Sequence, residues 1–249
     1  MKKPQRRTSI SPSGGLYLTS WSGLDEYLRA RPDLIVSIRC PPADKKKLEQ
    51  LLAKNQSSLS CSIDYSEVEK GLAVFVEVPV LDEFAFLEAA AKSEREFILA
   101  CDHVTDTRNL GALARTAAYF GMRYLILPKD RQAPISGATL GTAQGAFAYV
   151  QPVMVTNLGR TLNDLKERAY WILAADMDGQ PVESIRQDYE KKVLVLGAED
   201  KGVSQGILAK ADLTVAISPA EPKLESLNVS VAAGILIHAL HAHSAALKK

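Results

Sequence analysis

The stretch Ser226–Gly234, which reads Ser-Leu-Asn-Val-Ser-Val-Ala-Ala-Gly, leads into an apolar run that continues to Leu240. Small and aliphatic residues dominate the run, so it predicts a close-packed helix that is buried on more than one side. The first residues differ from the rest, because Ser226, Asn228 and Ser230 are polar and one such side chain is enough to cap a helix. A helix N-terminus also carries free backbone N–H groups. The stretch therefore predicts a buried helix whose first turn presents polar groups and N–H donors.

The composition is that of an ordinary globular protein. The chain has 249 residues, of which 47% are hydrophobic and 24% charged, enough for one large domain or two modest ones. Apolar runs are shorter than the roughly 18 residues of a membrane span, and the N-terminus lacks the apolar core of a signal peptide. The three cysteines, Cys40, Cys61 and Cys101, are odd in number and lack metal-ligand spacing. Reduced thiols in a cytoplasmic protein are therefore expected.

Neither the charge nor the histidines identify a ligand. The net charge of +1 permits RNA binding without arguing for it. Basic residues are concentrated in residues 1–15, a Ser-, Pro- and Gly-rich segment that is predicted to be a disordered basic arm, and again at Lys45–Lys47. His238 and His241 share a helix face, but no cysteine or carboxylate joins them. A metal site is therefore not expected.

Residues 16–80 predict a small α/β domain, which Pro79 is expected to close because proline cannot continue a central strand. A helix within residues 81–96 is predicted to link this domain to the rest of the chain. Hydrophobic periodicity assigns the elements. They are a helix from Ser22 to Leu28, a strand at Leu34–Ile38, a helix from Asp44 to Lys54, strands at Leu59–Ile63 and Ala73–Val78, and the linking helix at Leu81–Lys92.

Residues 97–249 repeat a pattern of strand followed by helix. Near-continuous apolar strands that alternate with helices predict an open, doubly wound parallel sheet covered on both faces. Such a sheet binds ligands at the carboxyl ends of its strands. Glycine-rich phosphate-binding motifs do not follow these strands, so a nucleotide held through its phosphates is not expected. The predicted strands are Phe97–Cys101, Tyr124–Leu127, Trp171–Ala175, Val193–Leu196 and Leu213–Ile217, and the helices are Leu110–Phe120, Leu158–Ala169 and Gln205–Lys210.

The loop after the first of these strands leads into a well-bounded helix. Asn109 suits the N-cap position and Gly121 suits the position just after the last turn. Arg115 is the only charged residue inside this helix, among alanines and leucines. The helix by itself is also compatible with an arginine at the edge of the apolar face, whose guanidinium lies in solvent.

Two further loops follow buried strands. The segment Leu196–Gly202 has the pattern Gly-x-Glu-x-x-Gly, in which Gly197 would let a ligand approach the backbone and the second glycine suits a turn. Glu199, between the glycines, is by itself no more than a turn carboxylate. The third loop joins Ile217–Pro219 to the polar start of the last helix.

In this order and spacing, the three loops resemble the signature motifs of the SpoU-type (TrmH-like, SPOUT superfamily) RNA ribose 2′-O-methyltransferases. The resemblance covers about Phe97 to Leu240. Residues 16–80 more loosely resemble the ribosomal-protein-like, RNA-binding domain of the branch that methylates guanosine in rRNA. The chain departs from the family pattern at Thr107, Ala148, Ser218 and Ala220–Pro222. These departures leave the shape of the cofactor rim and the target nucleotide open.

The resemblance implies methyl transfer from S-adenosyl-L-methionine to a ribose 2′-hydroxyl in RNA, with rRNA expected rather than tRNA. A tRNA-directed enzyme and an inactive RNA-binding protein of the same fold are the alternatives. The resemblance also implies a deep C-terminal trefoil knot and a homodimer whose sites lie near the subunit interface, without a metal or a membrane. The implied residues are Asn109, Arg115, Glu199, Ser226 and Asn228 for catalysis, and Leu196, Gly197, Ile217, Pro219 and Leu227 for the cofactor.

Arg115 is poorly suited to act as a base, because a guanidinium with a pKa above about 12 does not readily lose a proton. It is better suited to stabilise the developing alkoxide, or to grip an adjacent phosphate. Asn109, Ser226 and Asn228 are expected to position the arginine and the ribose, and Glu199 to orient one of them. A phosphate oxygen or water would then take the proton.

Overall fold

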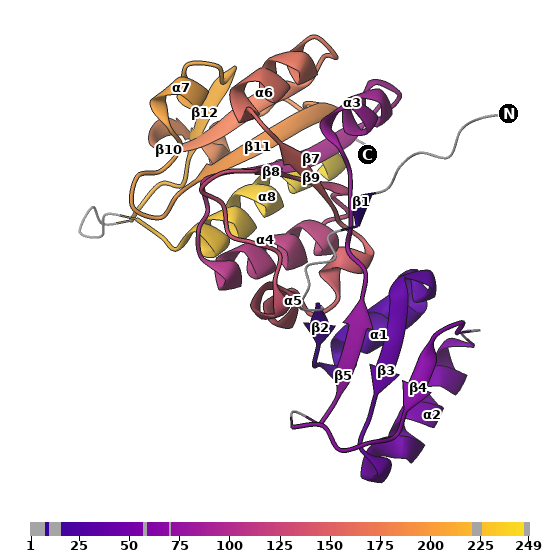
Figure 1. Cartoon of the computed structure of the whole chain (residues 1–249). Helices are drawn as coiled ribbons and strands as arrows, with labels where there is room; N and C mark the ends of the chain where they lie inside the picture. Colours follow the sequence, from indigo (N-terminus) through magenta and orange to yellow (C-terminus); the bar gives the residue numbers. More distant parts are fainter. Residues whose placement is uncertain (1–7, 10–15, 57–58, 70, 221–225, 247–249) are drawn as a thin grey trace, which may run out of the picture.

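The computed structural model describes residues 8–9, 16–56, 59–69, 71–220 and 226–246. These residues form a smaller and a larger layered unit, packed side by side (Figure 1). Most of the predicted basic arm lies outside the described residues. Its described part is strand β1 (Thr8–Ser9), which pairs antiparallel with β6 (Pro79–Val80).

A six-stranded parallel sheet forms the centre of the larger unit, as predicted. The strand order is β12-β10-β11-β7-β8-β9, so β7 and β11 are neighbours in the middle of the sheet. Strand β9 was not predicted; it contains Pro152, which an edge strand tolerates. The strands are β7 (Glu96–Asp102), β8 (Tyr124–Pro128), β9 (Gln151–Val155), β10 (Trp171–Pro181), β11 (Lys191–Gly197) and β12 (Leu213–Ala216).

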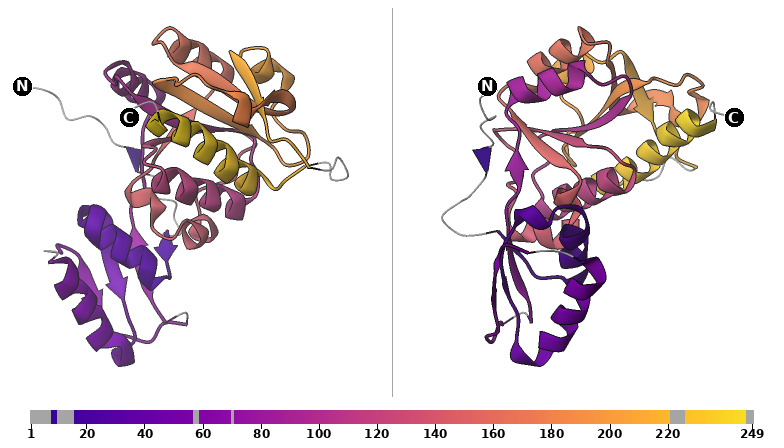
Figure 2. Two further views of the ribbon diagram at one scale, coloured as in Figure 1. Left: turned by 180° about the vertical axis from the view of Figure 1, so that it is seen from behind. Right: turned by 90° about the vertical axis from the view of Figure 1, so that its right-hand side faces the viewer.

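Helices cover both faces of this sheet, which confirms the doubly wound arrangement (Figure 2). Along β7, Leu99 and Cys101 belong to one core cluster and Ile98 and Ala100 to the other, as the alternation of a strand requires. The first cluster includes side chains of α4 (Thr107–Tyr119), α5 (Gly137–Ala143) and α8 (Val229–Ala246). The second includes those of α3 (Glu83–Ala91), α6 (Leu158–Lys166) and α7 (Gln205–Leu208).

The smaller unit is a four-stranded sheet with two helices on one face (Figure 1). Its first helix is capped by Ser20, whose hydroxyl accepts from the Gly23 N–H, and not by Ser22 as predicted. The strand before Pro79 ends at Val76, two residues earlier than predicted, and Pro79 starts β6, which pairs with β1 outside the four-stranded sheet. The elements are β2 (Tyr17–Leu18), α1 (Trp21–Ala30), β3 (Ile35–Arg39), α2 (Lys45–Asn55), β4 (Ser62–Asp64) and β5 (Ala73–Val76).

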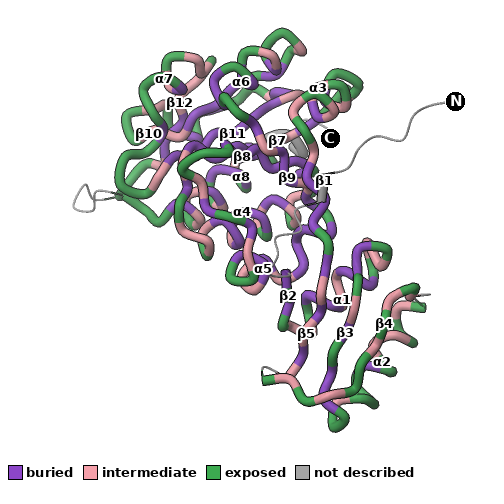
Figure 3. The backbone as a smooth tube through the Cα atoms, in the orientation of Figure 1, coloured by how far each residue is buried: buried purple, intermediate pink, exposed green. Residues whose placement is uncertain are grey.

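One hydrophobic core runs through both units (Figure 3). Leu18 and Tyr27 of the smaller unit belong to the same buried cluster as Phe147 of the larger one. A hydrogen bond also joins the two units, because the Tyr149 hydroxyl donates to the Glu26 carboxylate at 2.6 Å. Helix α3, the predicted link, packs against β9 and α6. The smaller unit is therefore attached to the larger one by buried side-chain contacts as well as by the covalent connection.

Candidate active site

Three irregular segments lie at the carboxyl edge of the larger sheet. Residues 103–106 lead from β7 to α4, residues 198–204 lead from β11 to α7, and residues 217–220 follow β12 while residues 226–228 precede α8. Because β7 and β11 are parallel neighbours, with Asp102 opposite Gly197, the first two segments start side by side. This edge is where a parallel sheet binds its ligands.

A chain of hydrogen bonds joins three of the predicted catalytic residues across these segments. The Asn109 amide donates to the Glu199 carboxylate. The Asn109 amide oxygen in turn accepts from Asn228 Nδ2 at 3.1 Å. The Asn228 amide oxygen accepts from the Ser230 N–H at 2.9 Å and from its hydroxyl at 2.6 Å. The first turn of α4 and the two later segments thus supply one member each of a continuous polar chain, Glu199–Asn109–Asn228, which ends at Ser230.

The prediction that Asn109 caps α4 is wrong. Its side chain is therefore free to join this polar chain. The cap is Asp106, whose carboxylate accepts from the N–H of Arg108 at 2.6 Å and of Asn109 at 3.4 Å. The hydrogen bond from the Arg108 guanidinium, together with these N–H groups, holds the pKa of Asp106 below its usual value. Gly121 follows the end of the helix with a φ of +71°, as predicted.

Arg115 lies outside the polar chain. Its side chain is exposed on α4, and within the described part of the protein its guanidinium has no ion pair or hydrogen bond. Ser226 is also exposed, and the serine that contacts Asn228 among the described residues is Ser230. Because this cation has no partner among the described residues, it can receive an anionic group.

The loop 198–204 is held tightly against the sheet. A Cβ on Gly197 would lie 1.9 Å from the carbonyl carbon of Gly202 and 2.1 Å from the Val203 nitrogen. Ala198 and Gly202 exchange two backbone hydrogen bonds, of 3.1 and 2.8 Å. The close approach to Gly197 in this structure is made by the chain's own loop.

Two residues that the sequence analysis did not single out lie at the same edge. Asp102 is 2% exposed, and its carboxylate accepts from the Ser204 N–H at 2.8 Å. The other carboxylate oxygen lies 2.8 Å from His103 Nδ1. The sequence could have indicated these two residues by their position, since both stand at the end of a buried strand. The preceding Cys101 is not reactive, because burial raises the pKa of its thiol to about 12.

The predicted cofactor-binding residues follow the sheet edge. Leu196 and Gly197 are the buried last residues of β11. Ile217 and Pro219 lie in irregular backbone after β12, the first half-buried and the second exposed. Leu227, just before Asn228, is an exposed apolar side chain. Residues 221–225, between these groups, lie outside the described residues.

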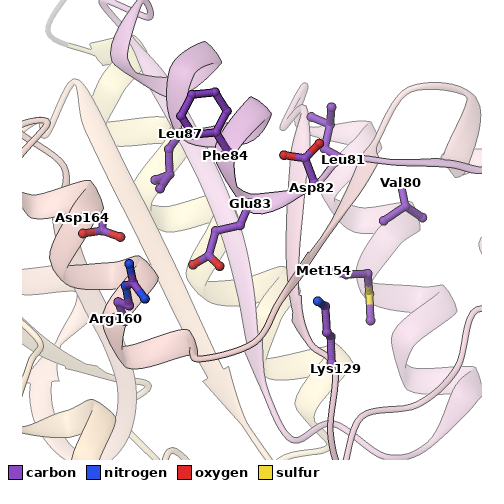
Figure 4. Close-up of a pocket in the computed structure, with 10 residues that line it drawn as sticks. All are labelled: Val80, Leu81, Asp82, Glu83, Phe84, Leu87, Lys129, Met154, Arg160 and Asp164. Carbon is purple, nitrogen blue, oxygen red and sulfur yellow. The ribbon is translucent and has the colours of Figure 1, made fainter. Parts of the chain in front are cut away.

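A cavity of about 640 Å³ opens elsewhere, where β8 and β9 end and α3 and α6 begin (Figure 4). It contains none of the predicted site residues. Its lining consists of Val80, Leu81, Asp82, Glu83, Phe84, Leu87, Lys129, Met154, Arg160 and Asp164.

The described residues contain neither a membrane-spanning helix nor a cluster of metal-binding side chains. None of their helices is long and apolar enough to cross a membrane. In the same part of the chain, histidine, cysteine and carboxylate side chains do not gather in threes as a metal site would need. His238 and His241 instead lie against the ring of Phe120, at centroid distances of 6.1 and 5.5 Å.

Comparison with known proteins gives matches over more than half of the chain. The SpoU rRNA Methylase family matches residues 96–238, more than half of the chain. An uncharacterised tRNA/rRNA methyltransferase of Borreliella burgdorferi is 36% identical over 208 residues, which are 77% of this chain and 90% of the relative. A 23S rRNA (guanosine-2′-O-)-methyltransferase of Acinetobacter baylyi is 36% identical over 162 residues, 64% of this chain and 65% of the relative.

Solved structures share the fold. The SpoU methyltransferase AviRb of Streptomyces viridochromogenes, in complex with the cofactor AdoMet, superimposes with a TM-score of 0.75 at 17% identity, over 94% of this chain and 91% of that one. The A. aeolicus TrmH/SpoU tRNA modifying enzyme has a TM-score of 0.55 at 27% identity, over 67% and 86% of the two chains. The chain therefore belongs to the SpoU rRNA methylase family and is an RNA methyltransferase.

Proposed function

We propose that this protein transfers the methyl group of S-adenosylmethionine to a ribose 2′-hydroxyl of ribosomal RNA. The observation that carries the proposal is the polar chain Glu199–Asn109–Asn228 with an unpaired guanidinium, that of Arg115, on the same helix as Asn109. The rRNA-directed relative from Acinetobacter supports this substrate, while other relatives carry a mixed tRNA/rRNA description. A ribosomal substrate also agrees with the cytoplasmic location expected from the free cysteines.

The groups at the sheet edge fit the cofactor. S-adenosylmethionine combines a flat apolar adenine with a cationic sulfonium. Leu227 is an exposed apolar side chain that can cover the adenine, and the carboxylate of Glu199 is an exposed anion at the mouth of the same loops. Leu196, Gly197, Ile217 and Pro219 would hold the cofactor mainly through their backbone groups.

The bound cofactor supplies an electrophilic methyl group, and the chain's residues would prepare the hydroxyl. Asn109 and Asn228 are fixed by each other and by Glu199, so their amides can orient the ribose without losing further side-chain freedom. Ser226, just before Leu227, would contact the same ribose. The Arg115 guanidinium would face the oxygen as negative charge develops on it, where a fixed cation stabilises the transition state.

Two features of the whole chain belong to this proposal. The first is a C-terminal trefoil knot, in which the segment after β12 would pass through a loop of the same unit before α8. It is supported by the return of α8 to pack against α4 and β11, in the middle of the sheet. The second is the smaller unit, residues 16–80, as the part that binds the RNA. Its helix α2 begins with three lysines, Lys45–Lys47.

A homodimer is the third feature. Helix α8 presents Val231 and Ile235, one turn apart, as exposed apolar side chains. Helix α4, which packs against α8, presents Arg115 and the exposed ring of Tyr119, also one turn apart. A second copy that covers the apolar side chains of α8 would also approach Arg115, so the site would be completed by the partner subunit.

Methylation assays with labelled S-adenosylmethionine and unmodified rRNA, followed by mapping of 2′-O-methyl groups, test the function. Arg115→Ala should lower kcat ~10²–10³-fold, since one preorganised charge is lost. The affinity for S-adenosylmethionine, measured by calorimetry, should stay within a few-fold. If the wild-type protein methylates tRNA but not rRNA, the proposed substrate is wrong and the proposed reaction stands. If it binds RNA without any turnover, the proposed reaction is wrong.

A further inference from the structure

The cavity of about 640 Å³ lies outside the proposed catalytic site but at the same edge of the sheet. Lys129 follows β8 directly, and Met154 lies near the end of β9. Strand β8 separates β9 from β7, so the ends of β7 and β9 are two strand spacings, roughly 10 Å, apart. A molecule that extends from the polar chain along this edge can therefore reach the cavity.

Part of the cavity lining suits a flat apolar ring. Phe84, in the first turn of α3, is 76% exposed although its side chain is entirely apolar. Val80, Leu81, Leu87 and Met154 add aliphatic and thioether surface (Figure 4). Single exposed apolar side chains are common on protein surfaces, but this one lines a cavity of the size that ligand sites have.

Two cations from different elements line the same cavity. Lys129 is held at the end of β8, because its backbone N–H donates to the Val155 carbonyl at 2.9 Å. Arg160 lies in the first turn of α6, where the Asn157 side chain accepts from its backbone N–H at 3.0 Å. Both side chains are exposed, and neither charged group has an ion pair or hydrogen bond with another described residue. Both are therefore available to phosphate groups.

The lining also contains three carboxylates, two of which already have donors. Asp82 caps α3 and accepts from the Ala85 N–H at 2.8 Å. Glu83 accepts from the Thr161 hydroxyl. The Asp164 carboxylate, half-buried on α6, has no donor within the part of the chain that the structure describes, so it can accept from N–H groups of a ligand. Nucleic-acid bases carry such groups on their edges.

We propose that this cavity binds an unpaired nucleotide of the RNA substrate, close in sequence to the nucleotide that is methylated. The inference rests on the proposed function. The base stacks on the Phe84 ring and presents its edge to Asp164, while the phosphates on either side contact Lys129 and Arg160. Single-stranded RNA is commonly bound in this way, by an aromatic ring that takes an unstacked base and by cations that follow the backbone.

The first test measures the affinity of the full-length protein for fluorescein-labelled fragments of the unmodified rRNA, by fluorescence anisotropy. Phe84→Leu keeps an apolar side chain but removes the stacking face, so affinity should fall roughly ten-fold. Phe84→Trp should bind at least as tightly as wild type. Trp171→Leu, which replaces an exposed ring at the opposite edge of the sheet, is the matched control and should bind like wild type.

The second test measures how affinity depends on salt. Lys129→Ala and Arg160→Ala should each make the slope of log affinity against log salt concentration shallower by about 0.7, the value for one phosphate contact on a single strand. Phe84→Leu should leave the slope unchanged, and so should the control Lys92→Ala, at the other end of α3. At saturating RNA, kcat should stay within about three-fold of wild type, because the cavity is separate from the reacting groups.

The third test is photo-crosslinking of RNA that carries 4-thiouridine at single positions, which should label Phe84 or Met154. Wild-type affinity in Phe84→Leu, unchanged slopes in both cation variants, or crosslinks confined to other parts of the chain would each overturn the inference. The proposed function stands in these cases if the wild-type protein methylates rRNA. If the wild-type protein binds RNA through the cavity but methylates none, the proposed function is wrong and the binding site stands.

Discussion

Gly197 shows how one residue determines the shape of the site. It is the last residue of β11, where the chain turns back so closely that only hydrogen fits beside the backbone of Gly202 and Val203. The two hydrogen bonds between Ala198 and Gly202 keep this turn closed. Because Glu199 stands inside it, the glycine indirectly fixes the carboxylate that Asn109 contacts.

Gly197→Ala should therefore impair the site as well as the fold. Its Cβ would overlap backbone atoms that cannot rotate away, so we expect a loss of about 1–3 kcal/mol in unfolding free energy. The affinity for S-adenosylmethionine should fall at least ten-fold. Denaturant unfolding and calorimetry measure the two effects. Gly206→Ala, in α7 with open space around its Cα, is the matched control, and equal behaviour of both variants would refute the explanation.

At the scale of the elements, the N-termini of α4 and α8 act together. Asp106 caps α4, which leaves the Asn109 side chain free to reach across to Asn228. The Asn228 amide oxygen meanwhile accepts from the Ser230 N–H in the first turn of α8. Each helix therefore contributes both its own cap and one half of a contact between helices. The contact stabilises the relative position of α4 and α8, at whose N-termini the proposed catalytic residues Asn109 and Asn228 lie.

This arrangement predicts strong coupling between Asn109 and Asn228. Asn109→Ala and Asn228→Ala should each lower kcat, and the double variant should be little worse than either, since each single change already breaks the polar chain. A double-mutant cycle on kcat measures the coupling. Asn109→Ala with Lys191→Ala, whose ammonium instead lies over the Tyr170 ring, is the control pair and should be additive. Additive losses at Asn109 and Asn228 would count against a joint role.

At the scale of the whole molecule, burial separates the helix α8 into two sides. Ala233, Leu236 and Ile237 are completely or almost completely buried in the chain's own core. Val231 and Ile235 are 51% and 39% exposed. Exposed aliphatic side chains at helical spacing beside a functional residue are typical of a surface that another protein covers. These two residues are therefore the ones with which to test the proposed dimer.

Val231→Glu with Ile235→Lys should convert the protein from a dimer to a monomer, because charges would have to be buried at the interface. Thermal stability of the monomer should be little changed, since both sites are exposed within one chain. Methylation should fall more than ten-fold if the partner completes the site. Light scattering at micromolar concentration measures the oligomer, with the exposed Met177→Glu as control. A monodisperse, fully active wild-type monomer would contradict the dimer.

The start of α2 allows a separate test of RNA binding. Lys45 lies over the Tyr65 ring at 5.1 Å and Lys47 over the Trp21 ring at 4.1 Å, so both ammonium groups are held at the surface of the smaller unit. Replacing Lys45, Lys46 and Lys47 by alanine should raise KM for RNA. The slope of the logarithm of RNA affinity against the logarithm of salt concentration should become shallower by about 0.7–0.9 for each lost phosphate contact. Affinity for S-adenosylmethionine should not change. An unaltered salt dependence would exclude this helix from the RNA interface.

Local patterns in the sequence were sufficient for most of the larger unit. Apolar strands alternating with helices predicted the parallel sheet, and the polar residues after β7, β11 and β12 indicated the edge where the site lies. The glycine at the end of α4 was identified from its position alone. These features are local, because backbone propensity and hydrophobic periodicity act over a few neighbouring residues. The family motifs added the expected roles of Asn109, Glu199 and Asn228.

Contacts between distant segments were decided only by the tertiary structure. Asn109 bonds residues 90 and 119 positions away, and such partners depend on β7 and β11 lying next to each other. The same holds for the hydrogen bond from the Ser204 N–H to the buried Asp102 carboxylate, which lies 102 positions away, and for the core shared by the two units. The physical reason is that burial and strand order belong to the assembled sheet, so no short stretch of sequence contains them.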